Sequence, residues 1–331
     1  MPRSLPELPR FPLIDEPSPL APLPRLSAAL GDRAALWIKR EDLLPLAFGG
    51  NKLRNLEMLV GAALAEGADC LVTAGRRWSN HCRLTAAAGA VAGLDVHLVL
   101  SGPPTDPPNP GRRLDELLGA TVHQAATADR AERDELVERV VADLRAAGRR
   151  PYSIGVGGGG VVGASGQLRA AAEVVGQAGA RSIGLDAVVL PSATGATQAG
   201  LLAGLRACGS TAQVVGVAVA HPPDELRSTI ASLLAGLAEL TGVAVDPAEI
   251  ELDGDQLGPG YGRPTPGAAK AALLLARTEG ILVDPIYTAK ALAGTIALVR
   301  SGRFDGRTVL FWHAGGLPGL FEPLDDGPPV A

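Results

Sequence analysis

The sequence has few aromatic residues and few cysteines. Aromatic side chains make up 3% of its 331 residues, so we expect a core filled by aliphatic side chains. The three cysteines, Cys70, Cys82 and Cys208, form no CxxC pair and have no histidine at a metal-ligand spacing. This usage argues against a disulfide scaffold and a structural metal site, and it favours free thiols in a reducing compartment.

Long apolar runs and a basic surplus are also missing. No run of about 18 apolar residues free of glycine and charge occurs, and prolines interrupt the N-terminal segment MPRSLPELPRFPLIDEPSPLAPLPR where a signal peptide would need an apolar core. The net charge is −5 and the basic residues are scattered. We therefore expect a cytoplasmic protein without a nucleic-acid or membrane partner.

Short apolar runs alternate with longer helical patterns along most of the chain. This alternation predicts α/β architecture with parallel sheets covered on both faces, and two such layers are favoured over one. The predicted strands are 36–39, 70–74, 96–100, 121–124, 187–191, 214–219, 281–284 and 309–313. The predicted helices include 53–67, about 130–148, 167–179 and 266–280.

Two glycine-rich loops compete for a phosphate-binding role. GVGGGGVVGASG (155–166) contains GxGxxG, but Asp186 precedes its strand where a nicotinamide site needs an acidic residue at the strand end. SATGAT (192–197) joins a strand to a helix, with hydroxyls and a glycine at the helix N-terminus. It predicts a phosphate cradle, and an ordinary turn capped by threonine is an equally good interpretation.

Lys52 follows a glycine turn in FGGNKLRN and stands at the start of a predicted helix. The positive end of a helix and partial burial both lower the pKa of a lysine, which suits a neutral nucleophile; a solvated surface lysine is the alternative. Ser79, Asn80 and His81 follow the strand at 70–74, where parallel sheets present ligand-facing groups. Helix capping by Ser79 or Asn80 remains open, and a satisfied half-buried histidine is favoured for His81.

Two of the three tyrosines stand in turn-like contexts. Tyr261 lies in GPGYGRPTPG and Tyr287 in VDPIYTAKALAG. A phenol on a loop is a candidate hydrogen-bond donor or proton carrier, although a ring stacked under the loop explains either one equally well.

Taken in order, several motifs resemble one enzyme family. They are PSPLAPLPRLSAALG, GGNKLRNLE, GRRWSNHCRLTAAAGAVAGL, ATGATQAGLLAG, YGRPT, RTEGILVDPIYTAKALAG and HAGGLPGLF. The sequence is therefore identified as similar to pyridoxal-phosphate enzymes of the D-cysteine desulfhydrase and 1-aminocyclopropane-1-carboxylate deaminase family. The resemblance covers about residues 10–322.

The resemblance implies a fold type II architecture, like the tryptophan synthase β subunit, and a homodimer. A large cofactor-binding domain would comprise residues 1–52 and 165–331, with a small α/β domain inserted at 53–164. Pyridoxal 5'-phosphate would be the cofactor, held covalently by Lys52. Among the further implied residues, Asn80 would contact its phenolic oxygen, the loop of Thr194, Gly195, Ala196 and Thr197 its phosphate, and Ser79, Tyr261 and Tyr287 the substrate.

The residue after Tyr287 separates the branches of this family. Cyclopropane deaminases have a glutamate there that bonds the protonated pyridine nitrogen, whereas this chain has Thr288. The neutral hydroxyl implies α,β-elimination from D-cysteine or a β-substituted alanine, giving pyruvate and ammonia. Ring opening, a specialised biosynthetic elimination or replacement enzyme, and an inactive cofactor-binding homologue remain the alternatives.

Departures from the family pattern gather around the expected substrate. Trp78 stands where the family has glutamine, preceded by Arg76 and Arg77, and a glycine run that includes Gly158 and Gly159 replaces polar side chains. With Ser79 and His81, these residues would shape the substrate pocket. They predict a pocket altered for a larger or an anionic substrate.

Overall fold

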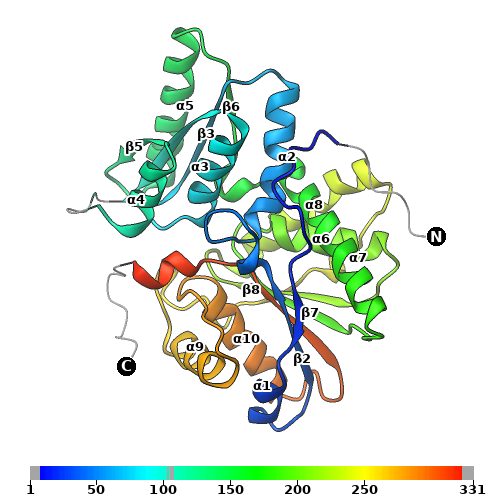
Figure 1. Ribbon diagram of the computed structural model, residues 1–331. Coiled ribbons are helices and arrows are strands. Elements are labelled where there is room, and N and C mark those ends of the chain that lie inside the picture. Colours follow the sequence, from blue (N-terminus) through cyan, green and yellow to red (C-terminus); the bar gives the residue numbers. More distant parts are fainter. Residues whose placement is uncertain (1–7, 103, 105–107, 323–331) are drawn as a thin grey trace.

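Buried aliphatic strands are divided between two sheets, seen in the lower and upper halves of Figure 1. The computed structural model describes residues 8–102, 104 and 108–322. No helix in these ranges combines the length and the apolar character needed to span a bilayer.

The larger sheet has the strand order β1-β2-β10-β7-β8-β9. Its pairings are parallel except that of β1 with β2. The strands are β1 (Leu20–Pro22), β2 (Ala35–Arg40), β7 (Ala187–Ser192), β8 (Gln213–Ala218), β9 (Glu251–Asp253) and β10 (Thr308–His313). Its helices are α1 (Pro24–Ala29), α6 (Val161–Ala180), α7 (Ala196–Ala207), α8 (Pro223–Thr241), α9 (Pro266–Glu279) and α10 (Thr288–Arg300).

Strand β7 shows why this sheet is buried on both faces. Val188 and Leu190 pack with α6, α7 and α8, while Ala187 and Val189 pack with α1, α9 and α10. Successive side chains of a strand point to opposite faces, so a continuous apolar run belongs between two helical layers.

The smaller sheet is parallel throughout, in the order β5-β4-β3-β6. Its core repeats the two-sided arrangement, with Leu71 packed against α2 and α3 and Val72 against α5. The strands are β3 (Cys70–Arg76), β4 (Asp95–Ser101), β5 (Thr121–Ala125) and β6 (Pro151–Ser153). The helices are α2 (Lys52–Ala65), α3 (Asn80–Ala92), α4 (Pro110–Leu117) and α5 (Arg130–Ala146).

Two parallel α/β layers were expected, and this fold class is confirmed. The smaller sheet uses residues 70–153 and the larger one residues 20–40 and 187–313. The predicted domain boundaries stay a prediction, and their outermost parts at 1–7 and 323–331 lie outside the described residues.

The predicted strand at 281–284 is wrong. This segment follows the left-handed Gly280 that ends α9 and forms no ladder. The carbonyl oxygen of Leu282 instead accepts a hydrogen bond from Nε2 of His313 at 2.7 Å, and Val283 is buried against the larger sheet. An apolar run can thus be buried without strand pairing, which hydropathy alone does not distinguish.

Candidate active site

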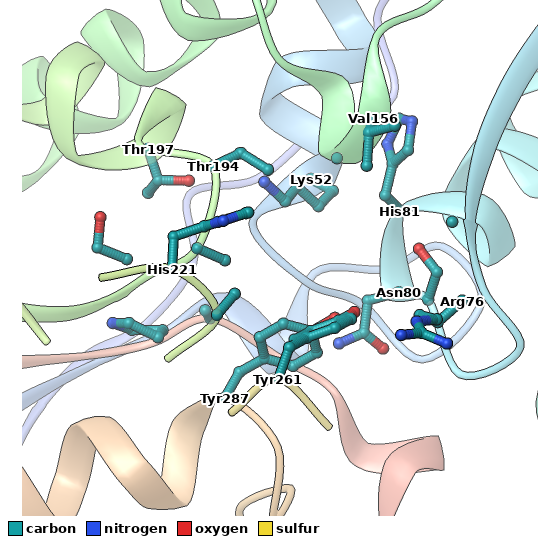
Figure 2. Close-up of a pocket in the computed structure, with 18 of the residues that line it drawn as sticks. Lys52, Arg76, Asn80, His81, Val156, Thr194, Thr197, His221, Tyr261 and Tyr287 are labelled. Atoms are coloured by element: carbon teal, nitrogen blue, oxygen red, sulfur yellow. The ribbon is translucent and has the colours of Figure 1, made fainter. Parts of the chain in front are cut away.

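A cavity of about 290 Å³ opens at the carboxyl ends of strands from both sheets. This is the edge at which parallel α/β sheets bind ligands. Figure 2 shows Lys52 in the cavity, between the threonines of one wall and the α3 side of the other. Nine of the predicted site residues line it, namely Lys52, Ser79, Asn80, His81, Thr194, Gly195, Thr197, Tyr261 and Tyr287.

Lys52 is the first residue of α2 and is half-buried. Burial lowers the pKa of its ammonium to about 8, because a charged group loses solvation away from water. About one-tenth of such an amine is neutral at pH 7, several hundred times more than for a lysine with an ordinary pKa. A neutral amine can act as a nucleophile or a base, and the role of Lys52 in holding the cofactor stays a prediction.

One ring nitrogen of His81 forms a hydrogen bond, and the other has no hydrogen-bond partner among the described residues. Its Nε2 lies 3.0 Å from Oγ1 of Thr73, and that hydroxyl donates its proton to the carbonyl oxygen of Ile154 at 2.9 Å. Nε2 of His81 must therefore carry the hydrogen, which leaves Nδ1 as an unprotonated acceptor with no partner among the described residues. Burial and the charge of Lys52 lower the pKa of His81 to about 3.

The first turn of α3 presents Ser79 and Asn80 to the cavity. The hydroxyl oxygen of Ser79 accepts the N–H of Cys82 at 3.2 Å, so Ser79 caps the helix. Its hydroxyl proton stays available for a ligand. The N–H groups at the start of a helix have no intrahelical acceptor, and this end of α3 therefore provides a site for a carboxylate.

The opposite wall has the chemistry of a phosphate site. The hydroxyl oxygens of Ser192 and Thr194 are buried and have no partner among the described residues. The hydroxyl of Thr197 accepts from Nδ2 of Asn51 at 2.9 Å and keeps its own proton. Three hydroxyls at the N-terminus of α7 can thus donate to a single anion. The phosphate group of the predicted cofactor fits these residues.

Gly195 leaves room for a phosphate group to approach the N-terminus of α7. Its φ of 78° lies in the left-handed region, and an added Cβ would lie 2.7 Å from Cγ1 of Ile230. A side chain at this position would be strained in its backbone and would clash with α8.

The two predicted tyrosines meet on a third side of the cavity. The phenol oxygens of Tyr261 and Tyr287 are hydrogen-bonded to each other, and their ring centroids are 5.8 Å apart. Burial raises the pKa of both phenols, so both stay protonated at neutral pH. The pair can act as a hydrogen-bond donor or a proton source.

Five predicted site residues do not line the cavity, namely Trp78, Gly158, Gly159, Ala196 and Thr288. The indole of Trp78 stands behind Tyr261, with ring centroids 6.3 Å apart. The hydroxyl of Thr288 donates to the carboxylate of Asp284 and accepts the N–H of Asp284 at 2.9 Å. The contact of Thr288 with the pyridine nitrogen therefore stays a prediction.

Three cationic or titratable lining residues escaped the sequence analysis. His221 follows the end of β8, a position at which the parallel-sheet rule could have found it. Arg130 and Arg133 come from the first turn of α5, which the sequence does not connect with the cavity. Within the described ranges, no group of three or more His, Cys, Asp or Glu side chains is placed to hold a metal ion.

Comparison with known proteins identifies the family of this chain. The family model of pyridoxal-phosphate dependent enzymes matches residues 13–315. The D-cysteine desulfhydrases of Salmonella choleraesuis (strain SC-B67) and Salmonella typhi are each 40% identical to the chain over 326 residues, covering 96% of it and 97% of the relative.

Solved structures give the same result at the level of the fold. The crystal structure of an ACC deaminase homologue superposes with a TM-score of 0.89 at 36% identity, covering 95% of this chain and 94% of that one. A threonine deaminase (T.th.) superposes with a TM-score of 0.67 at 20% identity, covering 90% and 92% of the two chains. The predicted resemblance is thus confirmed, with pyridoxal phosphate as the cofactor. The chain belongs to the family of pyridoxal-phosphate dependent enzymes.

Proposed function

We propose that this enzyme is a lyase that performs α,β-elimination on D-cysteine or another β-substituted alanine, releasing pyruvate, ammonia and the leaving group. The observation that carries the proposal is the lowered pKa of Lys52 in a cavity that also contains protonated phenols. Elimination needs a base for the α-proton and an acid for the leaving group. D-cysteine desulfhydrases at 40% identity support the choice of substrate.

Lys52 has two tasks in this proposal. Its neutral amine would hold the cofactor aldehyde, and the same side chain would accept the proton from the α-carbon of the substrate. When bound, the cofactor ring supplies the electron sink that makes this proton acidic. Burial of the side chain lowers the pKa of this amine, and its position at the N-terminus of α2 favours the neutral form as well.

The remaining residues position the cofactor and the substrate. Thr194, Gly195, Ala196 and Thr197 hold the phosphate at the start of α7, and Asn80 contacts the phenolic oxygen. The α-carboxylate of the substrate binds at the start of α3, where Ser79 donates its hydroxyl proton. This arrangement places the anions at two separate helix N-termini, in agreement with the direction of both helix dipoles.

Tyr261 and Tyr287 protonate or stabilise the departing group. Their hydrogen bond leaves one phenolic proton of the pair free to point into the cavity. A thiolate or other anion leaving the β-carbon gains a donor there, and a positioned acid of this kind contributes about 10²- to 10⁴-fold to a rate.

A substrate panel tests the proposal. Pyruvate and ammonia are measured with D- and L-cysteine, D- and L-β-chloroalanine and 1-aminocyclopropane-1-carboxylate, with Lys52→Ala as the control. We expect pyruvate from at least one β-substituted alanine. A four-carbon 2-oxoacid from the cyclopropane substrate alone would establish ring opening, the alternative that the ACC deaminase homologue supports. Absence of any oxoacid from a cofactor-loaded protein would establish an inactive homologue.

We also propose that the enzyme is a cytoplasmic homodimer. The free state of Cys70, Cys82 and Cys208 supports a reducing compartment. Light scattering coupled to size exclusion measures the subunit number directly, and a monomer at micromolar concentration contradicts the proposal.

A further inference from the structure

The charged side chains that line the cavity are all positive. Three arginines, Arg76, Arg130 and Arg133, line it together with Lys52, and the lining contains no Asp or Glu among the described residues. Such a wall attracts anions and repels cations. Part of this positive charge can stabilise the cofactor phosphate. The partners and positions of the three arginines show which of them is available to bind a substrate.

Arg130 and Arg133 are already neutralised. Arg130 forms an ion pair with Glu225 at 3.2 Å, and its side chain is 61% exposed. Arg133 forms an ion pair with Asp134 at 2.7 Å. Arg76, in contrast, has no hydrogen bond or ion pair from its guanidinium group among the described residues. Arg76 is half-buried, and none of its nitrogen atoms is among the fully enclosed polar atoms without a partner. Its guanidinium donors therefore remain open to an anionic ligand in the cavity.

The position of Arg76 separates it from the cofactor phosphate. It is the last residue of β3, on the α3 side of the cavity, and Figure 2 shows it across Lys52 from Thr194 and Thr197. Its charge reaches Tyr261, where it acts against the burial that raises the pKa of that phenol. Arg76 thus lines the same cavity as the proposed leaving-group acid and lies within electrostatic reach of it.

The α-carboxylate does not need Arg76. The free N–H groups and the Ser79 hydroxyl at the start of α3 already form an anion site. A second anionic group on the same substrate, extending from the β-carbon toward the tyrosines, would meet the guanidinium of Arg76. Planar guanidinium binds sulfonate, phosphate and carboxylate oxygens in pairs.

We infer that the preferred substrate is an amino acid whose β-substituent is anionic, and that Arg76 binds this group. The inference rests on the proposed elimination and names the substrate class for it. The α-proton passes to Lys52, the β-substituent leaves with the bonding pair as an anion, and water converts the released enamine into pyruvate and ammonia. No oxidant or reductant is needed.

The test compares Arg76→Gln and Arg76→Lys with the unchanged enzyme on two kinds of substrate. O-phosphoserine and 3-sulfoalanine represent phosphate and sulfonate groups, and β-chloroalanine is the neutral reference, each in both enantiomers. We expect Arg76→Gln to lower kcat/KM for the charged substrates by about 10- to 100-fold, mainly through KM, because the bound anion loses a charged hydrogen-bond donor. Arg76→Lys restores part of the loss, and β-chloroalanine changes by less than about 3-fold.

Several outcomes would overturn the inference. An equal loss on β-chloroalanine assigns Arg76 to the α-carboxylate that every substrate shares. Unchanged values for the charged substrates, or D-cysteine turned over more efficiently than either of them, remove the anionic preference. Arg112→Gln, which breaks an exposed ion pair with Glu116 outside the cavity, controls for the loss of one positive charge.

A binding measurement separates this inference from the proposed function. Charged amino acids are titrated into the cofactor-loaded enzyme while its visible absorbance is recorded. If no substrate yields pyruvate, the elimination fails, yet a spectral Kd that rises about 10-fold or more in Arg76→Gln still supports the anion site. An unchanged Kd overturns it.

Discussion

The phenol oxygens of Tyr261 and Tyr287 are hydrogen-bonded to each other across the cavity wall, although the two residues come from different loops. In this pair one phenol donates its proton to the oxygen of the other. The second phenol keeps a proton that it can donate to a ligand. We predict that Tyr261→Phe and Tyr287→Phe each lower kcat for elimination by about 10- to 100-fold. The visible absorbance of the bound cofactor should stay unchanged, and its loss in either variant would assign that tyrosine to cofactor retention.

Replacement of Lys52 by alanine tests the covalent attachment. We expect the visible absorbance band of the purified enzyme to disappear and pyruvate formation to fall by at least about 10³-fold, since both the attachment and the base are removed. Lys290 is the control, because its pKa is also lowered to about 8 while its Nζ is bonded to backbone oxygens outside the cavity. A band that survives in Lys52→Ala and vanishes in Lys290→Ala would contradict the assignment.

The start of α2 is fixed by a buried ion pair, two residues after Lys52. Arg54 donates to both carboxylate oxygens of Glu41 at 2.7 and 2.8 Å, and the two side chains are 5% and 0% exposed. Arg54→Met leaves a buried carboxylate without its partner, and we expect a loss of about 3–5 kcal/mol in the free energy of unfolding. Arg112→Met, which breaks an exposed pair, should cost no more than about 0.5 kcal/mol. Denaturant unfolding of both variants measures the difference.

Gly195 should be intolerant of a methyl group. Its positive φ and the contact with Ile230 predict that Gly195→Ala weakens cofactor binding by about 10-fold or more and lowers stability. Gly176→Ala in α6 is the matched control, because an added Cβ there meets nothing within 4 Å, and a helical Gly→Ala change stabilises by about 0.5–1 kcal/mol. Fluorescence titration of the apoenzyme with cofactor gives both affinities; equal affinities would contradict the cradle.

The lowered pKa of His81 predicts that the free energy of unfolding depends on pH. An unfolded histidine titrates near its usual pKa, whereas burial lowers the pKa of folded His81 to about 3. Below pH about 6.5 the unfolded chain therefore binds a proton that the native protein lacks. The stability present at neutral pH is lost progressively as the pH falls, by about 2 kcal/mol between pH 7 and pH 5. Urea unfolding at both pH values checks this, and His81→Gln should show a smaller loss than the unchanged protein.

Much of this protein could be predicted from sequence periodicity. The apolar runs at 70–74, 187–191 and 309–313 form parallel strands buried on both faces, because a strand covered by helices on two sides has no polar face. Lys52 and the loop at 192–197 could be located because a glycine turn before a helix leaves a chemical signature in consecutive residues.

The short edge strands β1, β6 and β9 could not be predicted in this way. Each has three residues, so neither alternation nor apolar length can mark it, and its place depends on pairing with a neighbouring strand. The prediction of a strand at 281–284 was wrong for the opposite reason. This apolar run is long enough to resemble a strand and includes the buried Val283, but it does not pair with another strand.

For the candidate site, too, local sequence and tertiary structure contributed different information. The order of residues indicated which side chains are candidates for the chemistry, because lysine, serine and tyrosine residues at helix starts and turns are local features. Tertiary structure alone decided their relations, such as the bond between Tyr261 and Tyr287 and the bare nitrogen of His81. It also left Arg76 without a partner among the described residues while Arg130 and Arg133 found carboxylates. Burial and pairing depend on what packs against a side chain, and no local pattern in the chain encodes that.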